Sequence, residues 1–240
     1  MNKVIAFTRG DIKNILRDGL LIASLFAPLL LAVFIRLAFP WLADLSYFHL
    51  QFDLTEHYPF ALSFLTMFTP MMIGAMAGLI LLDERDEQML TYYAVTPLGQ
   101  SGYLLYRLTL PALGSLIFSF LVLPLANLAE LNYLALVPVF TLAALQAPLV
   151  ALLMGAYAGN KVEGLTLTKG LGFTFIGPAL GYLAPHPWNY AGAIFPPYWV
   201  TEAFMASFAP GLPYALYLLG GFLSHILLIR YLLKRFVKRV

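Results

Sequence analysis

The chain has no cysteine and little charge. Charged residues make up 11% of its 240 residues, whereas a soluble domain carries about 25% because its surface must face water. Without cysteine, the chain has no disulfide, no thiolate metal ligand and no cysteine nucleophile. Hydrophobic residues reach 61%, and the mean hydropathy is +0.81. The composition excludes a soluble domain and predicts a chain surrounded largely by lipid.

The sequence also lacks the local motifs of common catalytic and cofactor sites. Residues 164–169 resemble a phosphate-binding loop only superficially, because no glycine precedes Lys169 and no strand precedes the turn. There is no His-Glu-x-x-His zinc motif and no Gly-x-Ser-x-Gly nucleophile elbow. We therefore expect no catalytic residue, cofactor or metal in this chain, and no nucleic-acid partner.

Two polar residues within apolar segments raise the alternative of an intramembrane protease. Ser115 lies in the third apolar run and His225 in the last. A serine at such a position is more typical of close packing between membrane helices. We interpret His225 as a neutral side chain bonded to a neighbouring helix, although an ionisable group inside a membrane is a functional candidate by default. The near absence of carboxylates from the spans disfavours an ion-coupled carrier.

Six apolar segments predict membrane spans. A helix needs about 20 apolar residues to cross a hydrocarbon core of about 30 Å. The predicted spans are residues 19–40, 59–82, 104–128, 133–157, 169–185 and 213–233. The fifth is short and is interrupted by Gly177, Pro178 and Gly181. The fold class expected is therefore an all-α integral membrane protein with six transmembrane helices, forming one domain over residues 1–240.

The basic residues predict the orientation. Thirteen of the fourteen Lys and Arg residues, all except Arg36, fall on one side of the predicted spans. The loops of the other side carry acidic residues: Asp44, Asp53, Glu56, Glu130 and Glu202. By the positive-inside rule the basic side is cytoplasmic, so both termini are expected in the cytoplasm. Arg36 is expected to extend to the outer surface or to pair with Asp44.

Two segments near the membrane surfaces are not simple spans. Residues 2–18 carry an apolar stripe among basic residues, which predicts an amphipathic helix in the membrane interface; a charged lead-in that fixes the topology is the alternative. Residues 186–212 are too aromatic for a solvated loop and too rich in proline to span. They predict short helices partly inserted in the outer leaflet, anchored by Trp188, Tyr190, Tyr198 and Trp199.

The segment between the second and third spans is the densest charge cluster of the chain. Its acidic residues gather at the beginning, where a helix favours negative charge, and Thr96-Pro97 ends the pattern. Residues 83–97 therefore predict a short cytoplasmic helix that docks into a groove of a partner. The alternative is a solvated loop whose charges mark the membrane boundary.

The arrangement resembles the permease (transmembrane) subunits of type-2 ABC transporters, and is closest to drug-export permeases associated with fluoroquinolones. Three stretches carry the resemblance. They are Asp83-Glu84-Arg85-Asp86-Glu87 with Thr96-Pro97-Leu98 and Tyr103-Leu104-Leu105-Tyr106-Arg107, then Asn160-Lys161-Val162-Glu163-Gly164, and then Pro197-Tyr198-Trp199. We do not carry the fluoroquinolone substrate over to this chain.

The resemblance implies an exporter driven by ATP in the plasma membrane of a prokaryote. Two permeases, identical or paralogous, would form the pathway in the bilayer, and two copies of a separate ATPase subunit would bind below. Residues 83–97 would be the coupling helix; the residues expected to dock are Asp83, Glu84, Arg85, Glu87, Met89 and Tyr93. Lys161 and Glu163 would contact the ATPase or each other. The nearly uncharged spans favour a hydrophobic or amphipathic substrate.

Two other classes of function remain as alternatives. One is a six-helix intramembrane enzyme or protease, which the lack of a catalytic constellation disfavours. The other is an immunity or assembly membrane protein of the same fold that transports nothing. On the leading hypothesis the chain is not an enzyme.

Overall fold

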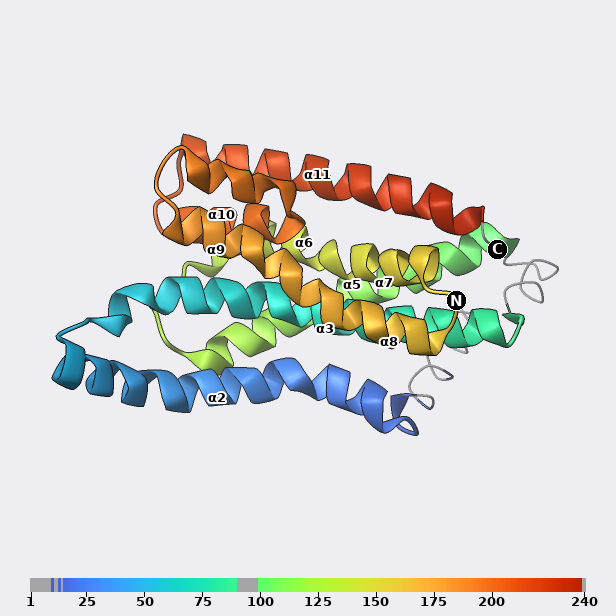
Figure 1. Ribbon diagram of the computed structural model, residues 1–240, viewed down its shortest axis with the longest axis horizontal. Helices are drawn as coiled ribbons and strands as arrows, with labels where there is room; N and C mark the ends of the chain where they lie inside the picture. Colours follow the sequence, from blue (N-terminus) through green and yellow to red (C-terminus); the bar gives the residue numbers. More distant parts are fainter. Residues whose placement is uncertain (1–9, 11–12, 14, 90–98, 239–240) are drawn as a thin grey trace.

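The apolar runs of the sequence form helices in the computed structural model, which describes residues 10, 13, 15–89 and 99–238 (Figure 1). No β-strand occurs among these residues. The α-helices and 3-10 helices (η) follow in this order: α2 (Gly19–Leu50), η1 (Leu54–His57), α3 (Tyr58–Asp86), α5 (Gly99–Ala126), α6 (Tyr133–Ala144), α7 (Gln146–Tyr157), α8 (Lys161–Gly170), η2 (Leu171–Phe175), α9 (Ile176–Leu183), η3 (Trp188–Ile194), α10 (Pro196–Ala206) and α11 (Leu212–Val237).

Five helical stretches within the described residues are long and apolar enough to cross a membrane. They are Gly19–Leu50, Leu54–Asp86, Gly102–Ala126, Tyr133–Tyr157 and Leu212–Val237. These stretches coincide with the first four predicted spans and the last one. The predicted all-α membrane fold is confirmed.

The predicted fifth span is not a single helix. Residues 161–183 form α8, η2 and α9 in succession, and Figure 1 shows this series running along the bundle beside α3. The 3-10 turn at Leu171–Phe175 precedes the predicted interruption at Gly177 and Pro178, both of which lie inside α9. This segment therefore follows the length of the bundle in three pieces.

Two predicted helices fall largely outside the described residues. One is the interfacial helix of residues 2–18; the other is the cytoplasmic helix of residues 83–97, of which residues 83–89 are described. The prediction is wrong at its beginning, because residues 83–86 form the last turn of α3 and do not start a separate helix. Asp18 is the N-cap of α2, and its Oδ1 accepts the N–H of Leu20 at 2.9 Å.

The first span is longer than predicted. α2 continues through Pro28 and Pro40 and ends at Leu50, where Gln51 adopts a left-handed conformation typical of a helix end. A proline removes one helical hydrogen bond, but membrane helices tolerate this loss. Pro40 is therefore not a helix end.

α3 is the central helix of the bundle. Of its most apolar stretch 83% is buried, against 11% in α11. α3 packs closely on α7 because both carry small residues: a Cβ added to Gly74 would lie 2.6 Å from the carbonyl oxygen of Ala147. The leucines of α11 are largely exposed along the outside of the bundle, as a lipid-facing surface would be.

A one-residue interruption at Leu145 separates α6 from α7. Pro148 explains it, because a proline offers no N–H to the carbonyl of Ala144 and its ring crowds that carbonyl. Gln146 becomes the first residue of α7, deep inside the bundle.

The outer segment forms η3 and α10, and Figure 1 shows α10 beside only part of α11. Trp188 and Tyr190 are exposed, as expected for interfacial anchors. Tyr198 and Trp199 correct the prediction. Tyr198 is 1% exposed and so packs inside. Trp199 is half-buried: its ring lies against Gly220 of α11, and its indole N–H donates to the carbonyl of Ala193 at 3.0 Å.

Of the two alternatives predicted for Arg36, only the ion pair with Asp44 is contradicted, and the Arg36 side chain is exposed. Its Nη1 lies 3.4 Å from the carbonyl oxygen of Leu125, to which it donates. No ion pair with Asp44 occurs among the described contacts. The guanidinium of Arg36 on α2 therefore bonds to the end of α5.

Candidate coupling site at the charged end

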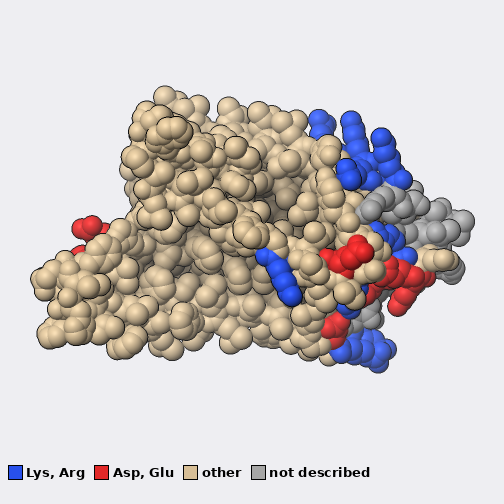
Figure 2. Space-filling view, in the orientation of Figure 1, with Lys and Arg blue, Asp and Glu red and all other residues tan. Residues whose placement is uncertain are grey.

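Most charged side chains gather at one end of the molecule (Figure 2). In Figure 1 this is the end where α2 begins, α3 ends, α8 begins and α11 ends. Of the predicted docking residues, Asp83, Glu84 and Arg85 belong to α3, and Lys161 and Glu163 belong to α8. Glu87 and Met89 follow the end of α3. The rest of the visible face carries few charges, in keeping with the span pattern.

The carboxylate of Glu84 lies inside the bundle. It accepts hydrogen bonds from the Tyr103 hydroxyl and the Arg107 guanidinium, and forms an ion pair with Arg107. Glu84 and Arg107 are each 8% exposed. The Arg107 guanidinium carbon also lies 5.6 Å and 5.5 Å from the ring centres of Tyr103 and Tyr106. This cluster joins the end of α3 to the beginning of α5.

Arg85 joins the same end of α3 to α7. Its Nη1 donates to the carbonyl of Gly155 at 3.1 Å and its Nη2 to the carbonyl of Ala158 at 2.8 Å. These carbonyls belong to the last turn of α7, where a helix lacks internal donors and favours positive charge. Arg85 therefore caps α7 within the chain.

Lys161 joins three segments by ion pairs. Its Nζ lies 2.8 Å from Asp83 Oδ2 and 3.1 Å from Asp18 Oδ2. Bonding to Asp83 chiefly raises the pKa of Lys161 above its ordinary 10.5, and bonding from Lys161 chiefly lowers the pKa of Asp18 below its ordinary 3.8. The beginnings of α2 and α8 are thus tied to the end of α3.

The Asn-Lys-Val-Glu-Gly stretch has a local structural explanation. Asn160, the N-cap of α8, accepts the N–H of Glu163 at its Oδ1 at 2.9 Å. Glu163 Oε2 accepts the N–H of Gly159 at 2.6 Å, one residue before the N–H that a capping box would use. A Cβ on Gly164 would lie 2.4 Å from Leu82 Cδ1, so α8 approaches α3 closely there. Lys161 and Glu163 are not described as a pair with each other.

The predicted docking residues therefore separate into two groups. Glu84 was expected to contact a partner, but it is buried and bonded within the chain, and Asp83 and Arg85 also bind inside. Glu87 is exposed just beyond α3, and Met89 is half-buried. Tyr93 lies outside the described residues.

Two residues of the cluster were not predicted as site residues. Tyr103 and Arg107 formed part of the motif, but their pairing with Glu84 follows only from the contact of α3 with α5. The available signal was Arg107 itself, a cation at the edge of an apolar run. Such a residue requires a partner.

Ser115 and His225 do not form a catalytic pair with each other. Ser115 Oγ donates to the carbonyl of Pro111 at 2.6 Å, on its own helix. His225 Nδ1 lies 2.8 Å from the carbonyl of Gly221, also on its own helix, so this nitrogen carries the proton. The prediction that His225 bonds to a neighbouring helix is not met by this contact.

Long apolar helices around α3, with most charged side chains collected at one end, define a multi-pass membrane protein. The chain belongs to the family of the fluoroquinolones export permease protein Rv2686c, whose family model matches residues 11–233. It is 30% identical over 234 residues to the fluoroquinolones export permease proteins MT2760 and Rv2686c of Mycobacterium tuberculosis, from strains CDC 1551 / Oshkosh and ATCC 25618 / H37Rv. Each alignment covers 96% of this chain and 92% of the relative. No solved structure matches the chain.

Proposed function

We propose that the chain is the membrane-spanning subunit of an ATP-driven ABC exporter, and that its charged end docks a separate ATPase. The residues 1–240 would form one permease domain. Two such domains would line the pathway, and two ATPase copies would bind at the cytoplasmic face. The observation that carries the proposal is the rigid connection of α3 to α5, α7 and α8 directly beside the exposed Glu87.

The connection supports a coupling role for mechanical reasons. A displacement of the segment after Glu87 would move the C-terminal end of α3. The buried Glu84–Arg107 pair would transmit this movement to α5, and Arg85 would transmit it to α7. Closely packed interiors move as units because they are nearly incompressible. In this proposal the ATPase is contacted by Glu87, Met89 and Tyr93. These residues are positioned by the bonds that Asp83, Glu84, Arg85 and Lys161 make within the chain.

The membership in an export permease family supports transport over an intramembrane enzyme. The relatives are named for export of fluoroquinolones, so we propose an amphipathic, ring-bearing drug as the substrate class. The basic end would face the cytoplasm of a prokaryote. By the same positive-inside rule, both termini would lie in the cytoplasm.

Co-purification from native membranes tests this proposal. A tagged full-length chain, extracted in mild detergent, is expected to bring down an ATPase with a phosphate-binding loop, identified by mass spectrometry. Cells that express both subunits are expected to accumulate less of a fluorescent fluoroquinolone, and to lose this difference when ATP is depleted. A chain that exports with no ATPase bound would overturn the proposal.

A further inference from the structure

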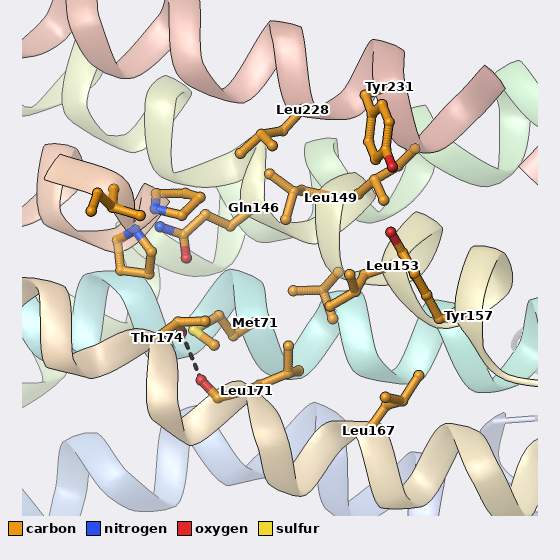
Figure 3. A pocket seen from close by; sticks show the side chains of 15 residues that line it. Met71, Gln146, Leu149, Leu153, Tyr157, Leu167, Leu171, Thr174, Leu228 and Tyr231 are labelled. Carbon is orange, nitrogen blue, oxygen red and sulfur yellow. Dashed lines mark hydrogen bonds between the residues drawn. The ribbon is translucent and has the colours of Figure 1, made fainter. Parts of the chain in front are cut away.

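A cavity of about 500 Å³ lies between α3, α7, η2, α10 and α11 (Figure 3). Most of its wall is apolar, from side chains such as Leu149, Leu153 and Leu228. Its volume falls in the range of pockets that hold drug-sized ligands. Ile194 and Tyr231, which also line it, are 81% and 54% exposed. The cavity therefore communicates with the outside of the bundle at membrane depth.

The amide of Gln146 is the exceptional group in this wall. Gln146 is 2% exposed and lines the cavity, where Figure 3 shows its amide between Met71 and Leu228. Neither Nε2 nor Oε1 has a hydrogen-bond partner among the described residues. A buried amide without partners costs on the order of several kcal/mol in apolar surroundings. This group can both donate and accept.

The other polar side chains of the wall differ from Gln146. The Thr174 hydroxyl donates to the carbonyl of Leu171 at 2.6 Å. The hydroxyls of Tyr157 and Tyr231 face each other in Figure 3, and these two side chains are exposed. Among the described residues of the wall, Gln146 is the buried polar side chain without a partner.

Two backbone positions near Gln146 have no N–H that could donate to its Oε1. Pro196 and Pro197 open α10 on the cavity wall, and a proline has no N–H to donate. The interruption at Leu145 holds Gln146 at the first turn of α7. The geometry thus presents one buried amide without a partner to a largely apolar cavity.

We propose that this cavity is a ligand site within a single chain, for a largely apolar, ring-bearing molecule with a planar carboxamide or lactam edge. The ligand's N–H would donate to Gln146 Oε1, and its carbonyl would accept from Gln146 Nε2. The rings would lie against Leu149, Leu153 and Leu228. As cargo of an exporter this ligand rests on the proposed function, but its binding requires no ATPase.

Two planar probes of one shape test the site. Biphenyl-4-carboxamide presents the required edge, whereas 4-isopropenylbiphenyl replaces its O and NH2 with CH2 and CH3. Binding is measured on the full-length chain in nanodiscs, with binding to empty nanodiscs subtracted. We expect the carboxamide to bind at least about tenfold more tightly than the hydrocarbon, because it satisfies a buried donor and acceptor.

Substitution of the amide separates this site from general hydrophobic binding. Gln146→Leu is expected to remove the tenfold preference and to leave the affinity for the hydrocarbon within about twofold. The matched control is Thr141→Val, a polar-to-apolar change on α6 whose hydroxyl bonds to its own helix and is absent from the cavity wall. It is expected to retain the preference.

Several results would overturn the site. Equal affinity for the two probes would mean that Gln146 bonds only to water, and an unchanged preference in Gln146→Leu would mean that the probe binds elsewhere. If Gln146→Leu and Gln146→Met both fail to fold, the amide is a structural group. Tight binding without ATP-driven export would contradict the proposed function and leave the ligand site intact.

Discussion

At the scale of single residues, the charged end depends on one buried ion pair. Glu84 and Arg107 are each 8% exposed, and the desolvation of two charges is offset only where their remaining hydrogen bonds are made. Tyr103 supplies one of them. The pair is therefore a strong constraint on how α3 meets α5.

Removal of one side chain of the Glu84–Arg107 pair should strongly destabilise the fold. Arg107→Met would leave the Glu84 charge buried without its cation, and is expected to destabilise the chain by about 3–5 kcal/mol. The double variant Glu84→Gln with Arg107→Met should lose less than the sum of the two single changes, because its uncompensated charge is gone. Thermal unfolding in detergent measures the cycle. Additive losses would show that the two side chains are not coupled.

The bridge of Lys161 predicts a pH dependence of limited size. The side chains of Lys161, Asp18 and Asp83 are 31%, 33% and 37% exposed, so Lys161→Met should cost at most about 1 kcal/mol. The Asp18 pKa is lowered on folding, so its contribution is present above 3.8 and is lost as the pH falls through the lower folded value. The Lys161 pKa is raised, so its contribution is present below 10.5 and is lost as the pH rises further.

Unfolding of the wild type and of Lys161→Met across pH checks this sign. The difference in the free energy of unfolding between the two proteins should be constant from about pH 5 to 9 and shrink toward about pH 3. A difference that grows in acid would contradict the ion pair.

At the scale of helices, small residues decide how closely α3 and α7 approach. A Cβ on Gly74 would meet backbone atoms of Ala147 at 2.6 Å and 2.8 Å, and a backbone cannot rotate away as a side chain can. Gly114 on α5 has nothing within 4 Å of its added Cβ. The two glycines thus form a matched pair for testing the packing.

Gly74→Ala is expected to force the helices apart and to destabilise the chain by about 1–3 kcal/mol. Gly114→Ala should be neutral or stabilising by up to about 1 kcal/mol, because alanine favours the helix. Unfolding midpoints of the two variants in one detergent compare them directly. Equal effects would mean that the α3–α7 contact is looser than described.

The sequence predicted helices better than their ends and contacts. Long apolar runs identify α3 and α11 because length and composition suffice. They fail at Pro40, which α2 passes through, and at the fifth span, where the 3-10 turn at Leu171–Phe175 divides the segment. No periodicity in the sequence reveals that Glu84 meets Arg107, since that pairing depends on how two helices pack.

At the scale of the whole molecule, the apolar sides and the charged end serve different surroundings. The exposed leucines of α2 and α11 suit contact with lipid or with a second permease. At the charged end, ion pairs join α3 to α5 and join the beginnings of α2 and α8 to α3. Glu87 lies exposed at this end, beyond the Glu84 pair. Glu130 is also exposed, but lies in the loop between α5 and α6 at the opposite end.

The most direct measurement is ATPase binding and ATP hydrolysis by the complexes of Glu87→Arg and Glu130→Arg. Both variants make the same charge reversal on exposed residues, and both are expected to insert and fold. Glu87→Arg should bind the ATPase at least about tenfold more weakly and hydrolyse ATP correspondingly less, because it opposes the partner's charge, whereas Glu130→Arg should match the wild type. Wild-type binding and hydrolysis in Glu87→Arg would contradict docking at the charged end.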